Sequence, residues 1–260
     1  MNMRSFITPL VILVFAASSA LGFAHSNSGR RPRPAVSMYF DYLDQSRAKY
    51  AAMKTYSDTG TVTVEYGTPG VSGPPSADHY SFSTFYRAPR QFLFDFKADP
   101  ATGDGRLVIW ADGAEFNTWW SETKTHEVYP QGQGATAFAV TAYPTKNSAM
   151  MIAPMLFSQA GLHGSITDLK VLRTDPVDTV NGHKCYKLVG EVALAYGTGA
   201  VTGARPTTIW IDVETMLVRK ILEDTPKDAP AVDRITTTFE PVAEPKIDDA
   251  KFKFAPPKAG

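Results

Sequence analysis

Two stretches of the sequence decide the fold. From Phe239 to Pro257 the chain reads FEPVAEPKIDDAKFKFAPP, and from Tyr86 to Phe96 it reads YRAPRQFLFDF. The first stretch closes with an alternating segment, 251–254, which two prolines end. The second opens with a turn and continues as a strand whose alternate residues are phenylalanines on one face. We therefore expect a strand in each stretch.

Period-two alternation extends through most of the chain, which predicts a sheet of about ten strands. Asp112-Gly113 and Asn181-Gly182 are typical of hairpin turns. Strands follow one another without crossover helices, so we expect antiparallel pairing. The expected strands are 61–66, 80–86, 91–97, 106–111, 115–121, 127–129, 168–173, 183–194, 207–212, 217–222, 234–239 and 252–254.

Helical periodicity is confined to two places. Residues 37–55 place apolar side chains near one face, and the apolar, methionine-rich segment 135–160 predicts one or two short helices kinked at Pro154. A sheet with one apolar face must curl or be covered. The expected fold is α+β and mostly β: a strongly curved antiparallel sheet covered by a few short helices.

The N-terminal residues have the pattern of an export signal. Arg4 precedes an apolar core at 6–15, and small residues lead to a cleavage site near Ala24. A membrane anchor is the alternative, but the apolar run is shorter than the roughly 20 residues that a spanning helix needs. No cysteine follows the core, so there is no lipobox. We expect a signal peptide at 1–24 and a periplasmic location.

A basic, proline-rich tail follows at 25–36, and a single domain is expected at 37–260. The arginines of the tail would either contact anionic head groups or belong to a solvated linker. With 26 basic and 26 acidic residues, the charge argues against nucleic acid as a partner. Cys185 is the only cysteine, which excludes an intrachain disulfide, and its apolar strand predicts a core position.

Motifs for catalysis are absent from the sequence. The five histidines follow no metal-ligand spacing, and there is neither a serine nucleophile elbow nor a phosphate-binding glycine loop. The neighbouring carboxylates at 223–224 and 248–249 are expected to be solvated pairs. We therefore expect no metal, no cofactor and no enzymatic activity, although residues brought together in space could still form a site.

The two quoted stretches resemble the LolA-type superfamily of periplasmic lipoprotein carriers. In that superfamily a strand opens after an Arg-Pro turn, and the chain ends in an Asp-Ala-x-Phe-x-Phe-x-Pro-Pro signature, matched here at 249–257. The hairpin at Asn181 and the strand 209–212 look more like a sister branch, an exported domain family of unknown function. The resemblance implies an incomplete barrel with a helical lid over a hydrophobic cavity.

The resemblance also implies roles for individual residues. Either Arg87 or Arg90 would tether the lid through its backbone carbonyls, although the Arg-Ala-Pro-Arg turn departs from a direct Arg-Pro, and each could be an ordinary surface arginine. The methionines at 150–155 would form the lid, or simply pack in the core. The expected cavity residues are Val62, Val64, Phe82, Phe92, Phe94, Trp119, Met151, Met155 and Phe157.

The function implied by the resemblance is carriage of lipid, or of the acyl chains of lipoproteins, by a monomer. Membrane proteins of the inner or outer membrane would be its donors or acceptors. Two alternatives stay open: a sensor or interaction module on the same scaffold, and a structural envelope protein whose own aromatic side chains fill the cavity.

Overall fold

The computed structural model describes residues 41–67, 76–99, 101, 105–113, 115–157, 162–193, 204–226 and 232–257. The expected signal peptide and basic tail lie outside these residues. Residues 35–260 form one compact unit.

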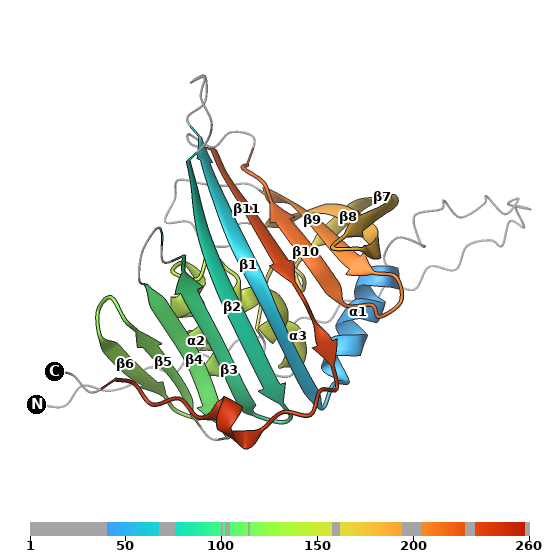
Figure 1. The fold of residues 1–260 in the computed structure, drawn as a ribbon. Coiled ribbons are helices and arrows are strands. Elements are labelled where there is room, and N and C mark those ends of the chain that lie inside the picture. Colours follow the sequence, from blue (N-terminus) through green and yellow to red (C-terminus); the bar gives the residue numbers. More distant parts are fainter. Residues whose placement is uncertain are drawn as a thin grey trace, which may run out of the picture. The chain divides into compact units, whose positions relative to one another are not determined.

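Within the described residues, twelve strands form one antiparallel sheet (Figure 1). Its order is β6-β5-β4-β3-β2-β1-β11-β10-β9-β8-β7, and β12 pairs with the beginning of β1. The expected fold class is confirmed: the fold is mostly β, and its sheet is antiparallel and not closed. The strands are β1 (Thr55–Gly67), β2 (Ser76–Arg87), β3 (Gln91–Ala98), β4 (Arg106–Asp112), β5 (Phe116–Trp120), β6 (Thr125–Tyr129), β7 (Lys170–Val180), β8 (His183–Ala193), β9 (Ala204–Asp212), β10 (Val218–Glu223), β11 (Val232–Phe239) and β12 (Val242–Ala243).

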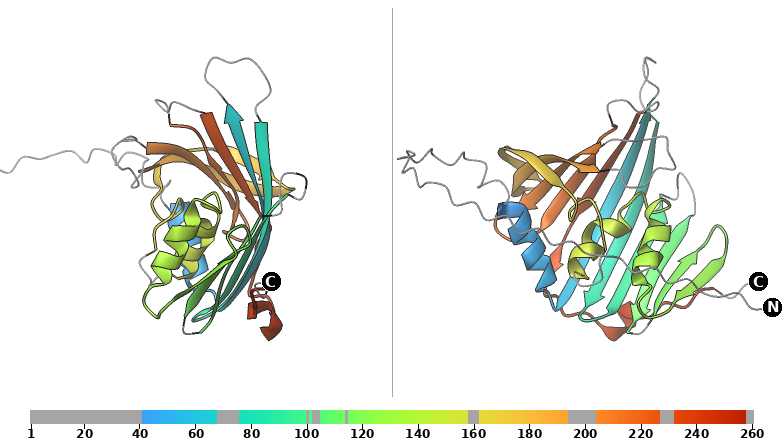
Figure 2. Two further views of the ribbon diagram at one scale, coloured as in Figure 1. Left: turned by 90° about the vertical axis from the view of Figure 1, so that its left-hand side faces the viewer. Right: turned by 180° about the vertical axis from the view of Figure 1, so that it is seen from behind.

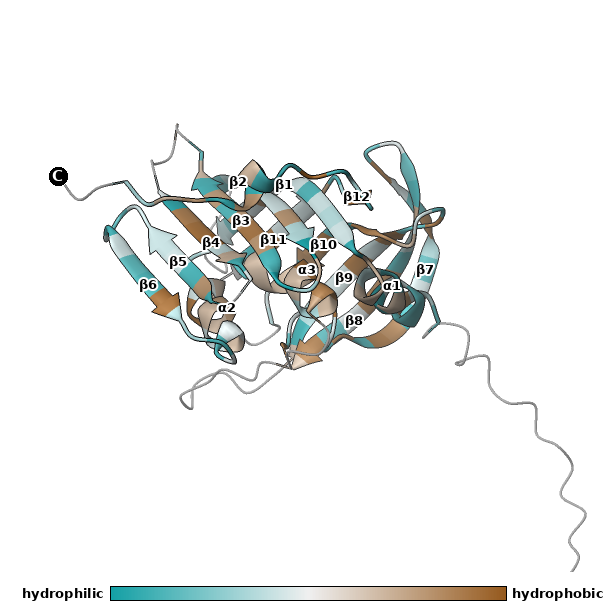
Figure 3. Ribbon diagram, turned by 90° about the horizontal axis from the view of Figure 1, so that it is seen from below, coloured by the Kyte–Doolittle hydropathy of each residue, from teal (hydrophilic) through white to brown (hydrophobic). Residues whose placement is uncertain are grey.

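In the part of the chain that the structure describes, three α-helices cover one face of the sheet, which bends around them (Figure 2). They are α1 (Asp41–Ala51), α2 (Gly134–Ala142) and α3 (Ala149–Leu156), with α3 contacting both others. Figure 3 shows α3 between α1 and α2. In α1, acidic residues occupy the first turn and Lys49 the last, which complements the helix dipole.

Helix α3 contains Pro154 and lies within the segment 135–160, where short helices were expected. Pro154 has no N–H to donate to the carbonyl of Met150, four residues earlier. Gly164 packs against that carbonyl so closely that an added Cβ would overlap the oxygen. The glycine therefore lets the segment after α3 return alongside the helix.

Strand register places the residues of the central strands in rows across the sheet. Asp58 of β1 pairs with Thr84 of β2, which pairs with Phe94 of β3. Because side chains alternate between faces, residues in such a row share a face. This row faces the helices, as the burial of Phe94 in the main core cluster shows.

The C-terminal segment corrects one expectation. Residues 252–254 do not form a closing strand; residues Asp249–Phe252 form a 3-10 helix, whose N-terminal Asp248 accepts a hydrogen bond from the N–H of Ala250 at 2.8 Å. Strands β1 to β4 are each already paired on both sides, so they leave no edge for another strand there. Phe254 instead packs on the face away from the helices, with its ring centroid 4.9 Å from that of Trp110.

Local turn and core predictions agree with the structure. Asn181 and Gly182 adopt positive φ values of 48° and 83°, as a two-residue hairpin turn requires. Cys185 is buried, in a small cluster with Val180 and Trp210.

Gly60 of β1 has no room for a side chain. An added Cβ would overlap both the ring of Phe82 and the carbonyl oxygen of Thr238. Because β1 is paired on both sides, its backbone cannot shift freely, and we expect Gly60→Ala to lower the free energy of unfolding by about 1–3 kcal/mol in urea titrations. Thr59→Ala, at the exposed neighbouring position, should change it by less than about 0.5 kcal/mol. Equal losses in the two variants would contradict the packing argument.

Candidate functional site

The apolar side chains predicted for a cavity meet between the sheet and the helices. Seven of them are buried in one cluster: Val62, Val64, Phe82, Phe92, Phe94, Met151 and Met155. Phe157 packs against this cluster, and its ring centroid lies 5.5 Å from that of Phe92. Strands β1, β2 and β3 supply one wall, and α3 supplies the other.

Trp119 is the exception among the predicted cavity residues. It lies in a second cluster with Leu93, Val108 and Trp110, on the face of the sheet away from the helices. Its ring centroid is 5.6 Å from that of Phe254 in the C-terminal segment. Trp119 therefore does not belong to the apolar set under the helices.

The space under α3 is filled by the protein's own side chains. A pocket of about 10 Å³ lies there, no more than one water molecule needs. It is lined by Asp58, Phe82, Thr84, Phe92, Phe94, Ser148, Ala149, Ile152, Ala153 and Phe239.

Tyr86 holds the C-terminal end of α3. Its hydroxyl donates to the carbonyl oxygen of Leu156 at 3.2 Å, and its ring packs edge-on against Phe157 at 5.2 Å. The last carbonyls of a helix have no partner within the helix, so this hydroxyl satisfies one of them. The residue that contacts the end of α3 is thus Tyr86, whereas the resemblance assigned such a contact to Arg87 or Arg90.

The two arginines of the turn have other surroundings. The Arg87 guanidinium donates to the carbonyl oxygen of Ile247 at 2.5 Å and to Asp249 at 2.6 Å, and lies 4.9 Å from the Phe252 ring centroid. It therefore holds the C-terminal segment, and its hydrogen bond lowers the pKa of Asp249. Arg90 is exposed at the end of the turn.

The segment that follows α3 is held at two further points. Arg47 of α1 donates to the carbonyl oxygens of Ile166 and Thr167 at 2.7 and 2.8 Å. The hydroxyl of Ser165 donates at 2.5 Å to Glu223 of β10, which is buried rather than solvated as expected from the sequence. Burial raises the pKa of Glu223 against the effect of that hydrogen bond. The helix and its return segment are therefore attached by a small number of polar contacts.

Asp58 is a buried carboxyl on the face that carries the apolar cluster. Its Oδ2 accepts a hydrogen bond from the hydroxyl of Tyr56 at 2.6 Å, and Tyr56 is itself beside Tyr50 of α1. Burial raises the pKa of Asp58 to about 6, while the Thr84 hydroxyl and amide and the Tyr56 hydroxyl act in the opposite direction. The sequence prediction missed this residue because the strand was expected to begin only at residue 61.

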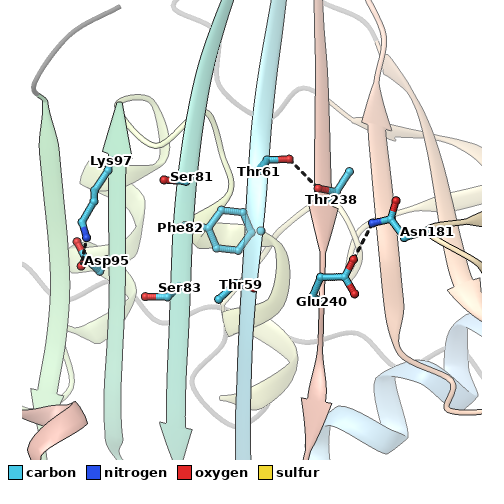
Figure 4. Close-up of a pocket in the computed structure, with 11 residues that line it drawn as sticks. Thr59, Thr61, Ser81, Phe82, Ser83, Asp95, Lys97, Asn181, Thr238 and Glu240 are labelled. Carbon is cyan, nitrogen blue, oxygen red and sulfur yellow. Dashed lines mark hydrogen bonds and ion pairs between the residues drawn. The ribbon is translucent and has the colours of Figure 1, made fainter. Parts of the chain in front are cut away.

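A polar hollow lies on the opposite face of the sheet (Figure 4). Its volume is about 660 Å³, and side chains from β1, β2, β3 and β11 line it with Asn181. Its polar groups largely bind one another: Thr61 with Thr238 at 2.7 Å and Asn181 with Glu240 at 2.6 Å, while Asp95 pairs with Lys97 and Arg106. These mutual pairs make the hollow a polar surface of the sheet.

Within the described ranges, no group of three or more His, Cys, Asp or Glu side chains is placed to hold a metal ion. None of the helices in those ranges is long and apolar enough to cross a membrane.

Comparison with known proteins identifies a sequence family. The family described as "Predicted periplasmic protein (DUF2092)" matches residues 41–260. No curated protein matches the sequence.

Several solved structures are similar to the chain at low identity. The lipoprotein LppX of Mycobacterium tuberculosis is 13% identical, with 82% of this chain and 98% of that chain covered and a TM-score of 0.47. LprF of Mycobacterium bovis is 11% identical over 82% and 95%, with a TM-score of 0.42. A LolA superfamily protein of Nitrosomonas europaea is 7% identical over 83% and 97%, with a TM-score of 0.35. All of these TM-scores are below 0.5, so the likenesses carry no argument about function.

Proposed function

Because the chain belongs to the DUF2092 family of predicted periplasmic proteins, we propose that it is a non-catalytic periplasmic carrier. Its cargo is a lipid, or the acyl chains of a lipoprotein, held between the curved sheet and the helices after α3 has moved aside. Membrane proteins that deliver or accept the cargo are its partners under this proposal.

The observation that carries the proposal is the character of α3. All eight of its residues are buried, and all are apolar. A helix of eight residues is too short to be stable by itself in water, so its conformation depends on this packing. It occupies the place that an acyl chain would need, against the phenylalanines of β2 and β3.

The free energy needed to expose the side chains of α3 is of the same order as the free energy gained by burying an acyl chain in their place. Exposing the five large side chains of α3 would cost roughly 8–15 kcal/mol, at about 1.5–3 kcal/mol each. Burying an acyl chain of about 16 carbons returns about 12 kcal/mol, at about 0.8 kcal/mol per methylene. An acyl chain can therefore offset the displacement of α3.

The composition of α3 and its attachments suit such an exchange. Three of the eight residues are methionines, whose flexible side chains can repack around a ligand or against another part of the protein. Only the Tyr86 hydroxyl donates a side-chain hydrogen bond to an α3 carbonyl among the described contacts.

Removal of the Tyr86 hydroxyl tests the proposal without disturbing the core. That hydrogen bond exists only while α3 is docked and contributes about 1 kcal/mol. Tyr86→Phe should therefore shift the protein toward the open form and bind the apolar fluorescent probe N-phenyl-1-naphthylamine about fivefold more tightly than the wild type. The measurement is a fluorescence titration of protein purified without detergent.

Tyr80→Phe is the matched control. Tyr80 lies on the same strand, and its hydroxyl donates to Asp78 at 3.4 Å instead of to α3. It should leave probe affinity unchanged. If the wild type and both variants bind neither the probe nor any lipid recovered by organic extraction, the carrier proposal fails, and the filled interior favours a structural protein without ligand.

A further inference from the structure

Asp58 has one carboxylate oxygen without a partner. Its side chain is buried, with 3% of the residue exposed, and Oδ2 accepts the bond from Tyr56. Among the described residues no donor reaches Oδ1 with hydrogen-bond geometry, although the hydroxyl and amide of Thr84 lie near enough to favour the charged form. The ion pairs of the described residues do not include Asp58. A buried acceptor left in this condition costs about 1–3 kcal/mol or more.

Asp58 lies beside the small space under α3. Asp58 lines the small space under α3 together with Phe82, Phe92 and Phe94, and the first residue of α3, Ala149, closes that space. When α3 leaves, Asp58 becomes a polar acceptor in an apolar wall. Apolar packing does not require a carboxylate at this position, because Val62 and Val64 occupy equivalent positions further along the same face of β1.

A second buried oxygen on the same side of the sheet also has no partner. Thr237 of β11 is fully buried, pairs in register with Val62, and its Oγ1 makes no hydrogen bond to a described residue. Polar atoms in protein interiors are nearly always paired. Thr237 Oγ1 is therefore a further buried oxygen on the covered face without a partner among the described residues.

We propose that the interior selects uncharged, hydroxyl-bearing lipids, whose hydroxyl donates a hydrogen bond to Oδ1 of Asp58 while the acyl chain lies along the phenylalanines. This inference rests on the proposed carrier function and narrows its cargo. A lipid ester without a hydroxyl leaves Oδ1 unpaired. A fatty-acid carboxylate places a like charge beside Asp58 and is disfavoured by repulsion.

Three competitors with the same acyl chain test the selectivity: 1-monopalmitin with hydroxyls, methyl palmitate without a donor, and palmitate with a negative charge. Each is titrated at pH 8 against the bound naphthylamine probe on the detergent-free protein. A hydrogen bond to a charged acceptor predicts that 1-monopalmitin binds about tenfold or more tightly than methyl palmitate. Palmitate should bind most weakly.

Asp58→Asn keeps the shape of the side chain and removes its charge. The variant should reduce the difference in affinity between 1-monopalmitin and methyl palmitate, and it should bind palmitate more tightly than the wild type does. A general loss of stability would not strengthen the binding of one ligand in this way. Glu223→Gln is the matched control, since Glu223 is also buried with an unpaired oxygen but is held by Ser165 outside the small space. It should preserve the order of the three ligands.

The outcomes separate this inference from the carrier function. Equal affinities of the three ligands for the wild type, or a preference for palmitate, would overturn the selectivity while leaving the carrier function intact. Failure of the probe and of all three ligands to bind would overturn both. If Asp58→Asn does not fold, the order of affinities in the wild type still decides.

Discussion

Replacement of Arg219 by methionine should lower the free energy of unfolding by about 3–5 kcal/mol. Arg219 and Asp212 form an ion pair at 3.0 Å, and their side chains are only 7% and 3% exposed. Asp212 also accepts the N–H groups of Glu214 and Thr215 in the turn between β9 and β10. Removal of the guanidinium would leave a buried carboxylate without its counter-charge.

The pKa of Asp212 agrees with this arrangement. Burial acts to raise it, but the two backbone N–H groups and the Arg219 guanidinium outweigh burial and lower it below the usual range. A lowered folded-state pKa means that the pair stabilises the protein above the ordinary aspartate pKa, and that this stability is lost as the pH falls through the folded-state value. The loss in Arg219→Met should therefore be largest near neutral pH and smaller in acid.

Urea unfolding of two arginine variants measures the effect. Arg234→Met removes an ion pair with Asp224 whose side chains are 49% and 39% exposed, and it should cost no more than about 1 kcal/mol. The double variant Arg219→Met with Asp212→Asn should recover part of the loss. A cost for Arg219→Met as small as that of Arg234→Met would contradict the account of the pair.

Asp58→Asn should stabilise the protein at neutral pH and change its pH dependence. The folded-state pKa of Asp58 is raised to about 6 from an ordinary value of 3.8, so the folded protein holds this proton more tightly than the unfolded chain. The contribution of Asp58 to the free energy of unfolding is fully present below pH 3.8, and it is lost as the pH rises toward 6. At about 1.4 kcal/mol per pKa unit, the decline amounts to about 3 kcal/mol.

The measurement is the difference in free energy of unfolding between the variant and the wild type from pH 4 to pH 8. The difference should grow in favour of the asparagine variant by up to about 3 kcal/mol, because only the wild type buries a charge there as the pH rises. A difference in free energy of unfolding that stays constant over this range would mean that the pKa of Asp58 is not raised in the folded protein.

Much of the sheet could be predicted because alternation is a local signal. The phenylalanines of β3 and the valines of β1 predict strands with one buried face, and the structure confirms both strands. The beginning of β1 was missed, since Ser57 to Gly60 has the composition of a turn. The buried residues at this end of the strand are Tyr56 and Asp58, which do not form an apolar alternation. The C-terminal alternation at 251–254 was misleading because the segment lies beside β3 and β4, which already have partners on both sides.

The site was predictable only in part, because neighbours on a strand face opposite ways. The sequence does not show which of Trp119 and Trp120 faces the helices, nor whether Tyr86 or Arg87 reaches α3. The structure settles both through register: Tyr86 pairs with Tyr56 and Phe92 on the covered face. Asp58 could not have been found from sequence, since its burial depends on α3, about ninety residues away.

Amide hydrogen exchange of residues 149–156 tests the central claim most directly, with the protein measured alone and with saturating 1-monopalmitin. If the acyl chain takes the place of α3, exchange in this helix should become at least about tenfold faster on binding, since its carbonyls and N–H groups lose their packed environment. Exchange in β1 to β3 should remain slow. Unchanged or slower exchange in α3 while the lipid is bound would contradict the claim.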